Sequence, residues 1–226
     1  MDTYSFMPII MTDLNKPWEK VLSLGVPMTF SQKSVISSTG KKQTVGLYFI
    51  RRGCIRLSNV SLGGQDKVLF YLGHGTLFNE IPMLQLVDNY IFTCMEHTEA
   101  VFLPQSCITT KFIREYPDLM LNLLESMSKK SQFFYSQLCC FQQLDTFTNV
   151  CRTLFSMHLH SREGDTVVPR LTQLELASYL GVHRSSLHKT MVRLKREGVI
   201  GDYCKNKLEI RDPDKLWNYS QEGYDN

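Results

Sequence analysis

The sequence of 226 residues predicts an α+β fold with strands, a long helix and a helical hairpin in that order. Three observations predict it. Short apolar segments between glycine-containing turns fill residues 42–104, and a helical pattern with no internal Pro or Gly follows over residues 117–144. A glycine then separates two amphipathic segments within residues 171–200.

The composition is that of an ordinary soluble protein, with 43% hydrophobic and 21% charged residues. No apolar run reaches the ~18 residues that a membrane span needs, and no basic flank precedes the short apolar stretch near the N-terminus. The seven cysteines are odd in number and form no C-x-x-C pair, which favours reduced thiols. We therefore expect a cytoplasmic protein without a signal peptide or membrane contact.

Five segments of the first half have the length and composition of strands, and their turns recur about every ten residues. The predicted strands are 44–50, 54–60, 67–72, 90–95 and 99–104. The turns between the first four contain Gly53, Gly63-Gly64 and Gly73-His74-Gly75. This spacing is typical of an antiparallel sandwich or barrel, and no βαβ alternation interrupts it.

The long helix carries a seam of residues at alternating steps of four and three, as in a coiled coil. The seam is Met120, Leu124, Met127, Ser131, Phe134, Leu138 and Phe141. The stripe is widened by Leu121, Phe133, Tyr135 and Cys139. A helix of ~28 residues spans about 42 Å, more than the core of one compact domain requires. A dimer helix is therefore favoured over a buried core helix.

The helical hairpin begins with a capping box of Thr172 and Glu175, turns at Gly181 and ends at Gly198. One face of its first helix is predicted to be Leu174, Ala177 and Leu180. A further helix over 145–160 precedes it, followed by the turn Arg162-Glu163-Gly164-Asp165 and a short strand in TVVP.

The second helix of the hairpin has an apolar arc and a basic arc at about 100° per residue. The apolar arc is Leu187, Thr190, Met191 and Leu194, and the opposite half is Arg184, Ser185, His188, Lys189, Val192, Arg193 and Arg196. Residues 184–207 contain seven Lys or Arg residues and two acidic residues, Glu197 and Asp202, so the segment has a net charge of +5. The alternatives are a solvated basic face and a protein-contact module. Together with the capping box and the turn, the basic arc favours a DNA-binding helix-turn-helix.

Two strands around Lys205-Asn206 follow as a basic wing, and Asp212-Pro213 caps a short C-terminal helix. This order resembles the Crp/Fnr superfamily of bacterial transcription regulators, from about Val21 to Leu216. The resemblance rests on GLYFIRRGCIRLSNVSLGGQDKVLFYLGHGTLFNE and LTQLELASYLGVHRSSLHKTMVRLKREGVI.

The resemblance implies a fold of three parts. These are an N-terminal antiparallel β-roll (a cyclic-nucleotide-binding-like jelly roll, 1–116), a long dimerisation helix (117–144) and a C-terminal winged helix-turn-helix (145–226). It also implies a homodimer on a two-fold symmetric operator of double-stranded DNA and a small effector sensed between β-roll and long helix. RNA polymerase is a further partner if the protein is an activator.

The resemblance matches some of the family's DNA-reading residues and not others. Arg184 matches a guanine-reading Arg, whereas Ser185 stands for a Glu and Lys189 for an Arg, which weakens base discrimination there. The predicted DNA-binding residues are Thr172, Gln173, His183, Arg184, Ser185, Ser186, His188, Lys189, Arg193 and Lys205.

The effector site departs from the cyclic-nucleotide pattern, because Asn79-Glu80 replaces Gly-Glu and Tyr90-Ile91 replaces Arg-Ser. No cation remains there for a cyclic phosphate, and aromatic residues replace the small hydroxylated ones of the long helix. A small organic, aromatic effector is expected, as in the similar halogenated-phenol sensors. Its predicted contacts are Leu69, Tyr71, Phe78, Asn79, Glu80, Tyr90, Phe92, Lys130, Phe134 and Tyr135. Lys130 either pairs with a ligand phenolate or carboxylate or is a solvated lysine, and Tyr90 and Phe92 are equally consistent with sheet core.

Two alternatives stay open: a cyclic-nucleotide-responsive regulator, and a redox sensor that acts through Cys139-Cys140 or Cys204. Iron–sulfur and haem sensing lack their ligands in this sequence. A cupin-like enzyme needs a His-x-His pair, and only His158 and His160 have that spacing, in a helix where they point apart. We expect no enzyme, no catalytic residue, no metal and no cofactor.

Overall fold

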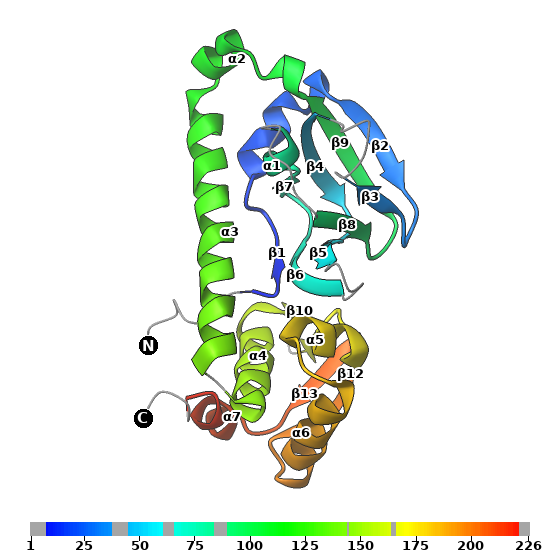
Figure 1. The fold of residues 1–226 in the computed structure, drawn as a ribbon, viewed down its shortest axis with the longest axis vertical. Coiled ribbons are helices and arrows are strands. Elements are labelled where there is room, and N and C mark those ends of the chain that lie inside the picture. The colour runs from blue at the N-terminus through cyan, green and yellow to red at the C-terminus, as the bar shows by residue number, and fades with distance from the viewer. Residues whose placement is uncertain are drawn as a thin grey trace. The chain divides into compact units, whose positions relative to one another are not determined.

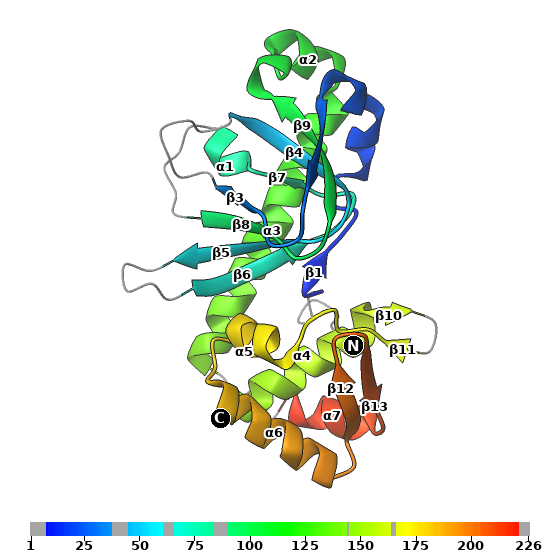
Figure 2. The ribbon, with the colours of Figure 1, turned by 90° about the vertical axis from the view of Figure 1, so that its right-hand side faces the viewer.

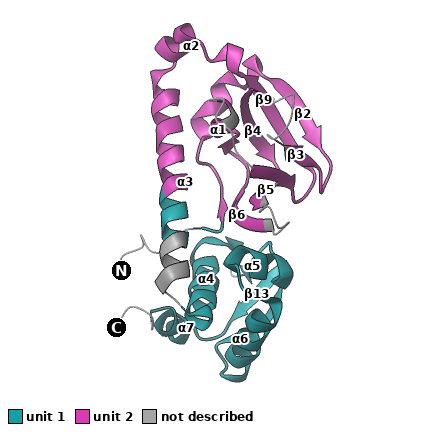
Figure 3. Ribbon diagram, viewed as in Figure 1, with its two compact units in different colours: residues 1–9, 132–226 teal, residues 10–131 magenta. Residues whose placement is uncertain are grey.

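The computed structural model describes residues 8–37, 45–60, 66–83, 90–143, 145–163 and 166–221, with only the backbone for Ser37, Val60, Asp66, Pro82 and residues 138–143. The chain divides into two compact units, residues 10–131 and residues 132–226 with 1–9 (Figure 3). The predicted division at residues 116 and 144 remains a prediction. No helix of the described part is long and apolar enough to cross a bilayer.

Two sheets form the β-roll of the first unit (Figure 1). One has the order β2 (Val26–Phe30), β9 (Thr98–Pro104), β4 (Gly46–Arg52), β7 (Leu77–Phe78). The other has the order β1 (Ile10–Met11), β6 (Asp66–Leu72), β5 (Ile55–Val60), β8 (Tyr90–Cys94), β3 (Val35–Ser37). All paired strands are antiparallel except β1 and β6.

All five predicted strands are confirmed as β4, β5, β6, β8 and β9. The sequence analysis missed β1, β2, β3 and β7. Three of these have two or three residues, too few for an alternating pattern, and β2 is an edge strand that contains Pro27. The predicted turn at Gly63-Gly64 lies outside the described residues.

The first unit also contains the short helices η2 (Lys16–Leu24), α1 (Glu80–Met83), η3 (Gln105–Cys107) and α2 (Thr110–Glu115). The long helix α3 (Pro117–Gln143) begins in this unit and continues into the second unit from residue 132. Trp18 of η2, Phe112 of α2 and Leu119 of α3 belong to one buried cluster with Leu47 and Leu103 of the sheet. This cluster fixes the start of α3 against the β-roll.

The predicted long helix is confirmed as α3, and its faces differ in exposure. Among its described side chains, those of Leu119, Ser126, Lys130 and Phe133 are buried. Leu121, Leu124 and Tyr135 are 60%, 62% and 70% exposed. Leu138, Cys139 and Phe141, part of the predicted stripe, have side chains outside the described residues.

The second unit is a helix-turn-helix with a β-wing (Figure 2). Its helices are α4 (Thr146–His160), α5 (Gln173–Leu180), α6 (Arg184–Arg196) and α7 (Pro213–Tyr219). Its sheet has the order β10 (Arg162–Glu163), β11 (Thr166–Val167), β13 (Lys207–Ile210), β12 (Ile200–Cys204).

Two local predictions in this unit were wrong. Arg162 and Glu163 form β10 rather than a turn, because β11 provides a partner strand for them. Leu174 is 64% exposed, and the buried face of α5 is formed by Leu176, Ala177, Tyr179 and Leu180. The predicted three-residue step from Leu174 misses Leu176, whose side chain is fully buried.

Candidate nucleic-acid interface and effector site

The turn between α5 and α6 has the predicted local geometry. Thr172 Oγ1 accepts from the Glu175 amide at 3.2 Å, and Glu175 Oε2 accepts from the Thr172 amide at 2.7 Å, which completes the capping box. Gly181 has φ +65°, in the left-handed region that favours glycine. His183 caps α6, with its Nδ1 accepting from the Ser185 amide at 3.3 Å.

The two predicted faces of α6 are confirmed. The buried residues of this helix are Leu187, Thr190, Met191 and Leu194. The exposed ones include Arg184, Ser185, His188, Lys189, Val192, Arg193 and Arg196. The first two turns therefore present Arg, Ser, His and Lys side chains, which suit base edges and phosphates.

Acidic residues neutralise part of the basic surface. Glu197 pairs with Arg193 at 2.9 Å, and Asp202 pairs with Lys195 at 3.0 Å. The hydrogen bond from Lys195 lowers the pKa of Asp202. Within the described chain, these pairs leave five cations of the hairpin and wing without an ion pair: Arg184, Lys189, Arg196, Lys205 and Lys207.

Arg193 has different surroundings from those expected of a DNA contact. Its guanidinium carbon lies 3.8 Å from the ring centroid of Phe147 and 5.8 Å from that of Tyr219. The sequence gives no signal for this, because Phe147 is 46 positions away in a different helix. The two rings give Arg193 partners within the protein itself.

The wing is fixed to the start of the helix-turn-helix. The Arg170 amide donates to the Lys205 carbonyl at 2.8 Å, and the Tyr203 hydroxyl donates to the Leu171 carbonyl at 3.0 Å. Burial raises the pKa of Tyr203 far above its usual value, so this hydroxyl remains a donor at neutral pH. Lys205 lies in the turn of this wing, and Lys207 is the first residue of β13.

The effector region begins at a backbone position that favours glycine. Asn79 has φ +77°, which asparagine tolerates better than other side chains. Its Nδ2 donates to the Gly46 carbonyl at 2.8 Å. Asn79, which stands where the resemblance expects a glycine, therefore has a backbone conformation that glycine adopts without strain, and it directly precedes α1.

Glu80 and Lys130 form a buried ion pair between α1 and α3, with side chains 11% and 9% exposed. Lys130 Nζ also donates to the Leu77 carbonyl at 2.7 Å. The alternative of a solvated Lys130 was therefore wrong. Burial of both charges is tolerated because each has a charged partner.

Aromatic side chains from the two sheets of the β-roll pack against one another. Phe78 stacks on Tyr48 with ring centroids 4.8 Å apart, and Phe92 lies 4.9 Å from Phe78. Phe78, Phe92 and Tyr71 are buried, which agrees with a sheet-core role for Phe92. The other predicted contacts are less enclosed: Leu69, Tyr90 and Phe134 are half-buried and Tyr135 is exposed.

A network that the sequence analysis missed connects the same region to α3. Buried Asn15 accepts from the Leu77 amide at 3.0 Å through Oδ1 and donates to Asn122 Oδ1 at 3.0 Å through Nδ2. Both polar groups of Leu77 are thus held, the amide by Asn15 and the carbonyl by Lys130. Two asparagines 107 positions apart carry no sequence pattern that predicts this.

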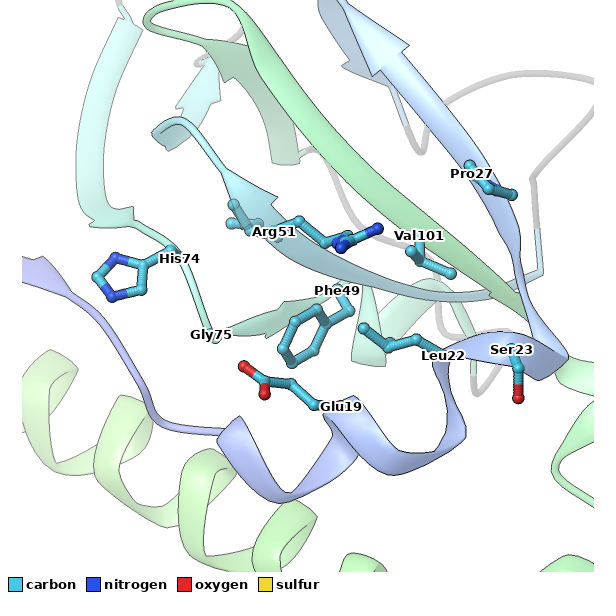
Figure 4. Close-up of a pocket in the computed structure, with 10 residues that line it drawn as sticks. Glu19, Leu22, Ser23, Pro27, Phe49, Arg51, His74, Gly75 and Val101 are labelled. Carbon is cyan, nitrogen blue, oxygen red and sulfur yellow. The ribbon is translucent and has the colours of Figure 1, made fainter.

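A pocket of about 540 Å³ lies elsewhere on the β-roll (Figure 4). Phe49, Ile50 and Val101 form buried parts of its lining, and exposed Glu19 and Arg51 lie at its rim. None of the ten predicted effector residues lines it.

The cysteines differ in environment. Cys54, Cys94 and Cys151 are buried, and burial raises the pKa of the Cys94 thiol, which disfavours its reactive thiolate. Cys204 is exposed in the wing. The side chains of Cys139 and Cys140 lie outside the described residues.

Comparisons with known proteins agree with this architecture. Residues 149–219 match the Crp-like helix-turn-helix domain, and residues 27–114 match the cyclic nucleotide-binding domain. The cyclic AMP receptor protein of Thermus thermophilus is 26% identical over 155 residues, which cover 68% of this chain and 70% of that protein.

Two solved structures have the same fold. A CprK variant complexed with OCPA is 21% identical with a TM-score of 0.76, covering 93% of this chain and 97% of its own. A CooA mutant from Carboxydothermus hydrogenoformans is 15% identical with a TM-score of 0.78, covering 93% of this chain and 100% of its own.

The two matched domains define a transcription regulator that binds DNA through a helix-turn-helix and carries a domain of the cyclic-nucleotide-binding type. The chain belongs to the Crp/Fnr superfamily. Members of this family are generally not enzymes.

Proposed function

We propose that the protein binds a two-fold symmetric operator as a homodimer, with Arg184, Ser185, His188 and Lys189 of α6 in the major groove. The observation that carries this is the exposed N-terminal half of α6, whose cations are left without an ion pair in the described chain. Arg184 reads a guanine. Phosphate contacts are assigned to Thr172, Gln173, His183, Ser186 and Lys205.

Selection of bound duplexes from a random-sequence pool tests this. We expect an inverted repeat with half-sites about one helical turn, ~34 Å, apart. Arg184→Ala should relax the preference at one base pair per half-site at a cost of about 1–3 kcal/mol. Enrichment of single, unpaired half-sites would exclude the dimeric arrangement, and unchanged specificity in Arg184→Ala would exclude its base contact.

We propose that the effector is a small aromatic acid whose anionic group replaces Glu80 as the ion-pair partner of Lys130. Lys130 is buried and donates to the carbonyl of Leu77, the residue before the buried aromatic Phe78, so an anionic group on an aromatic body matches the local chemistry. CprK, which shares the fold, has been solved in complex with o-chlorophenolacetic acid. Such a ligand can control DNA binding only if it binds two states of the dimer with different affinities.

Titration calorimetry with aryl acetates and phenolates against the wild type and Lys130→Met tests the effector class. Binding that disappears in Lys130→Met while the selected operator is still bound supports it. Binding of cyclic AMP in preference to every aromatic acid would instead favour the cyclic-nucleotide alternative. If the protein is an activator, RNA polymerase is its further partner.

A further inference from the structure

We infer that Arg193 is a positioning residue that fixes the recognition helix α6 to α4 and α7, rather than a DNA contact. This inference rests on the proposed reading of DNA by α6. It revises one of the ten predicted DNA-binding residues and gives the C-terminal helix a role in DNA recognition.

The guanidinium of Arg193 packs against the ring of Phe147 and lies near that of Tyr219. Its carbon lies 3.8 Å from the Phe147 centroid and 5.8 Å from the Tyr219 centroid, and these two rings meet edge to face at 5.2 Å. Phe147 belongs to α4 and Tyr219 to α7. A planar guanidinium stacks on such rings, whereas an ammonium acts as a compact point charge. Arg193 therefore joins three helices.

The two carboxylate oxygens of Glu197 each accept a hydrogen bond, one from α6 and one from α7. Arg193 Nε donates to Glu197 Oε1 at 2.9 Å, and the Tyr219 hydroxyl donates to Oε2 at 2.8 Å. Lys215 Nζ donates to the backbone carbonyl of Glu197 at 3.3 Å. The carboxylate thus bridges the end of α6 and the end of α7.

The position of these contacts along α6 explains what they do. They hold the C-terminal half of the helix, whereas Arg184, Ser185 and His188 lie in its first two turns. Because a helix is stiff over this length, fixing one half sets the direction in which the other half projects its side chains. A second contact, between Phe155 of α4 and Trp217 of α7 at 5.0 Å, keeps α7 in place.

A phosphate contact and a positioning role for Arg193 predict different effects when the residue is replaced by Lys or Gln. A phosphate contact depends on charge, so Arg193→Lys retains it, and Arg193→Gln reduces the salt slope of log affinity by about 0.9 for each phosphate that is no longer neutralised. A positioning residue depends on the planar guanidinium, so Lys does not rescue it and the slope is unchanged.

The experiment measures affinity at several salt concentrations for a duplex selected from a random pool and for a scrambled duplex of equal length. The variants are Arg193→Gln, Arg193→Lys, Tyr219→Phe and Arg193→Lys/Tyr219→Phe, assayed below the unfolding temperature of each. Lys205→Ala is the phosphate-contact control, and Lys195→Ala is the matched cation of α6, already paired with Asp202.

We expect both Arg193 variants to weaken binding of the selected duplex about tenfold, roughly 1.4 kcal/mol, with the scrambled duplex and the salt slope unchanged. Tyr219→Phe should weaken it less, and the double variant should bind no worse than Arg193→Lys. Rescue by Lys with a lower slope in Arg193→Gln, or wild-type binding by all variants, would overturn the inference. If the wild type selects no duplex, the proposed DNA reading fails instead.

Discussion

Asn79 has a left-handed backbone conformation and a side-chain hydrogen bond that supports it. Its φ of +77° and its hydrogen bond to the Gly46 carbonyl are both required at this turn. We expect Asn79→Val to lower the free energy of unfolding by about 2–3 kcal/mol, from backbone strain and the broken hydrogen bond. Asn79→Gly should lower it by only about 1 kcal/mol. Urea unfolding measures both, and equal losses would contradict the strain argument.

The buried ion pair makes a second prediction at the residue scale. Lys130→Met leaves the Glu80 carboxylate buried without its partner and should cost about 3–5 kcal/mol of stability. In Lys130→Met/Glu80→Gln no charge remains, so most of that stability should return. Urea unfolding of the four members of this double-mutant cycle gives the coupling. Additive effects of the two changes would mean that the pair does not interact as the structure indicates.

At the scale of elements, the stability of the end of α6 depends on pH through the carboxyl group of Glu197. Hydrogen bonds from Arg193 and then Tyr219 hold the pKa of this carboxyl below its usual value. Because the folded pKa is depressed, its stabilising effect is present above the unfolded pKa of about 4.3 and is lost as pH falls through the folded value. The thermal midpoint should therefore fall between about pH 5 and pH 3.

Glu197→Gln should reduce this fall without abolishing it. Asp202 and Glu209 in the same unit also have a lowered pKa, caused by Lys195 and Arg211, and they remain in the variant. Calorimetry across this pH range measures the slope. A Glu197→Gln slope as steep as that of the wild type would show that Glu197 contributes nothing to acid sensitivity.

For the whole molecule, the exposed apolar face of α3 predicts the oligomeric state. Leu121 and Leu124 are 60% and 62% exposed, and Met127 of the same predicted seam is half-buried. Leu124→Lys should convert the proposed dimer to a monomer, because a charge would be desolvated at the contact. Sedimentation velocity measures this. Leu174→Lys is the matched control, since Leu174 is 64% exposed but lies on α5. A monomeric wild type would exclude the dimer helix.

Local rules were enough to predict much of the fold from the sequence. Five strands, the long helix, the capping box and the two arcs of α6 depend on spacing, capping and turn residues close together in the chain. For the same reason the resemblance to the Crp/Fnr superfamily was visible in two continuous segments. The short strands were not predicted, because two or three residues are too few to show a period. The predicted burial of Leu174 was wrong, because burial depends on neighbouring elements.

Only the tertiary structure decided the partners of charged and polar side chains. Lys130 meets Glu80 across 50 positions, Arg193 meets Phe147 in another helix, and Asn15 meets Asn122 across 107 positions. Sequence spacing determines which side chains share a face of one element. Which face meets which depends on how the elements pack, and packing decides whether a charge is paired within the protein or left available to bind DNA.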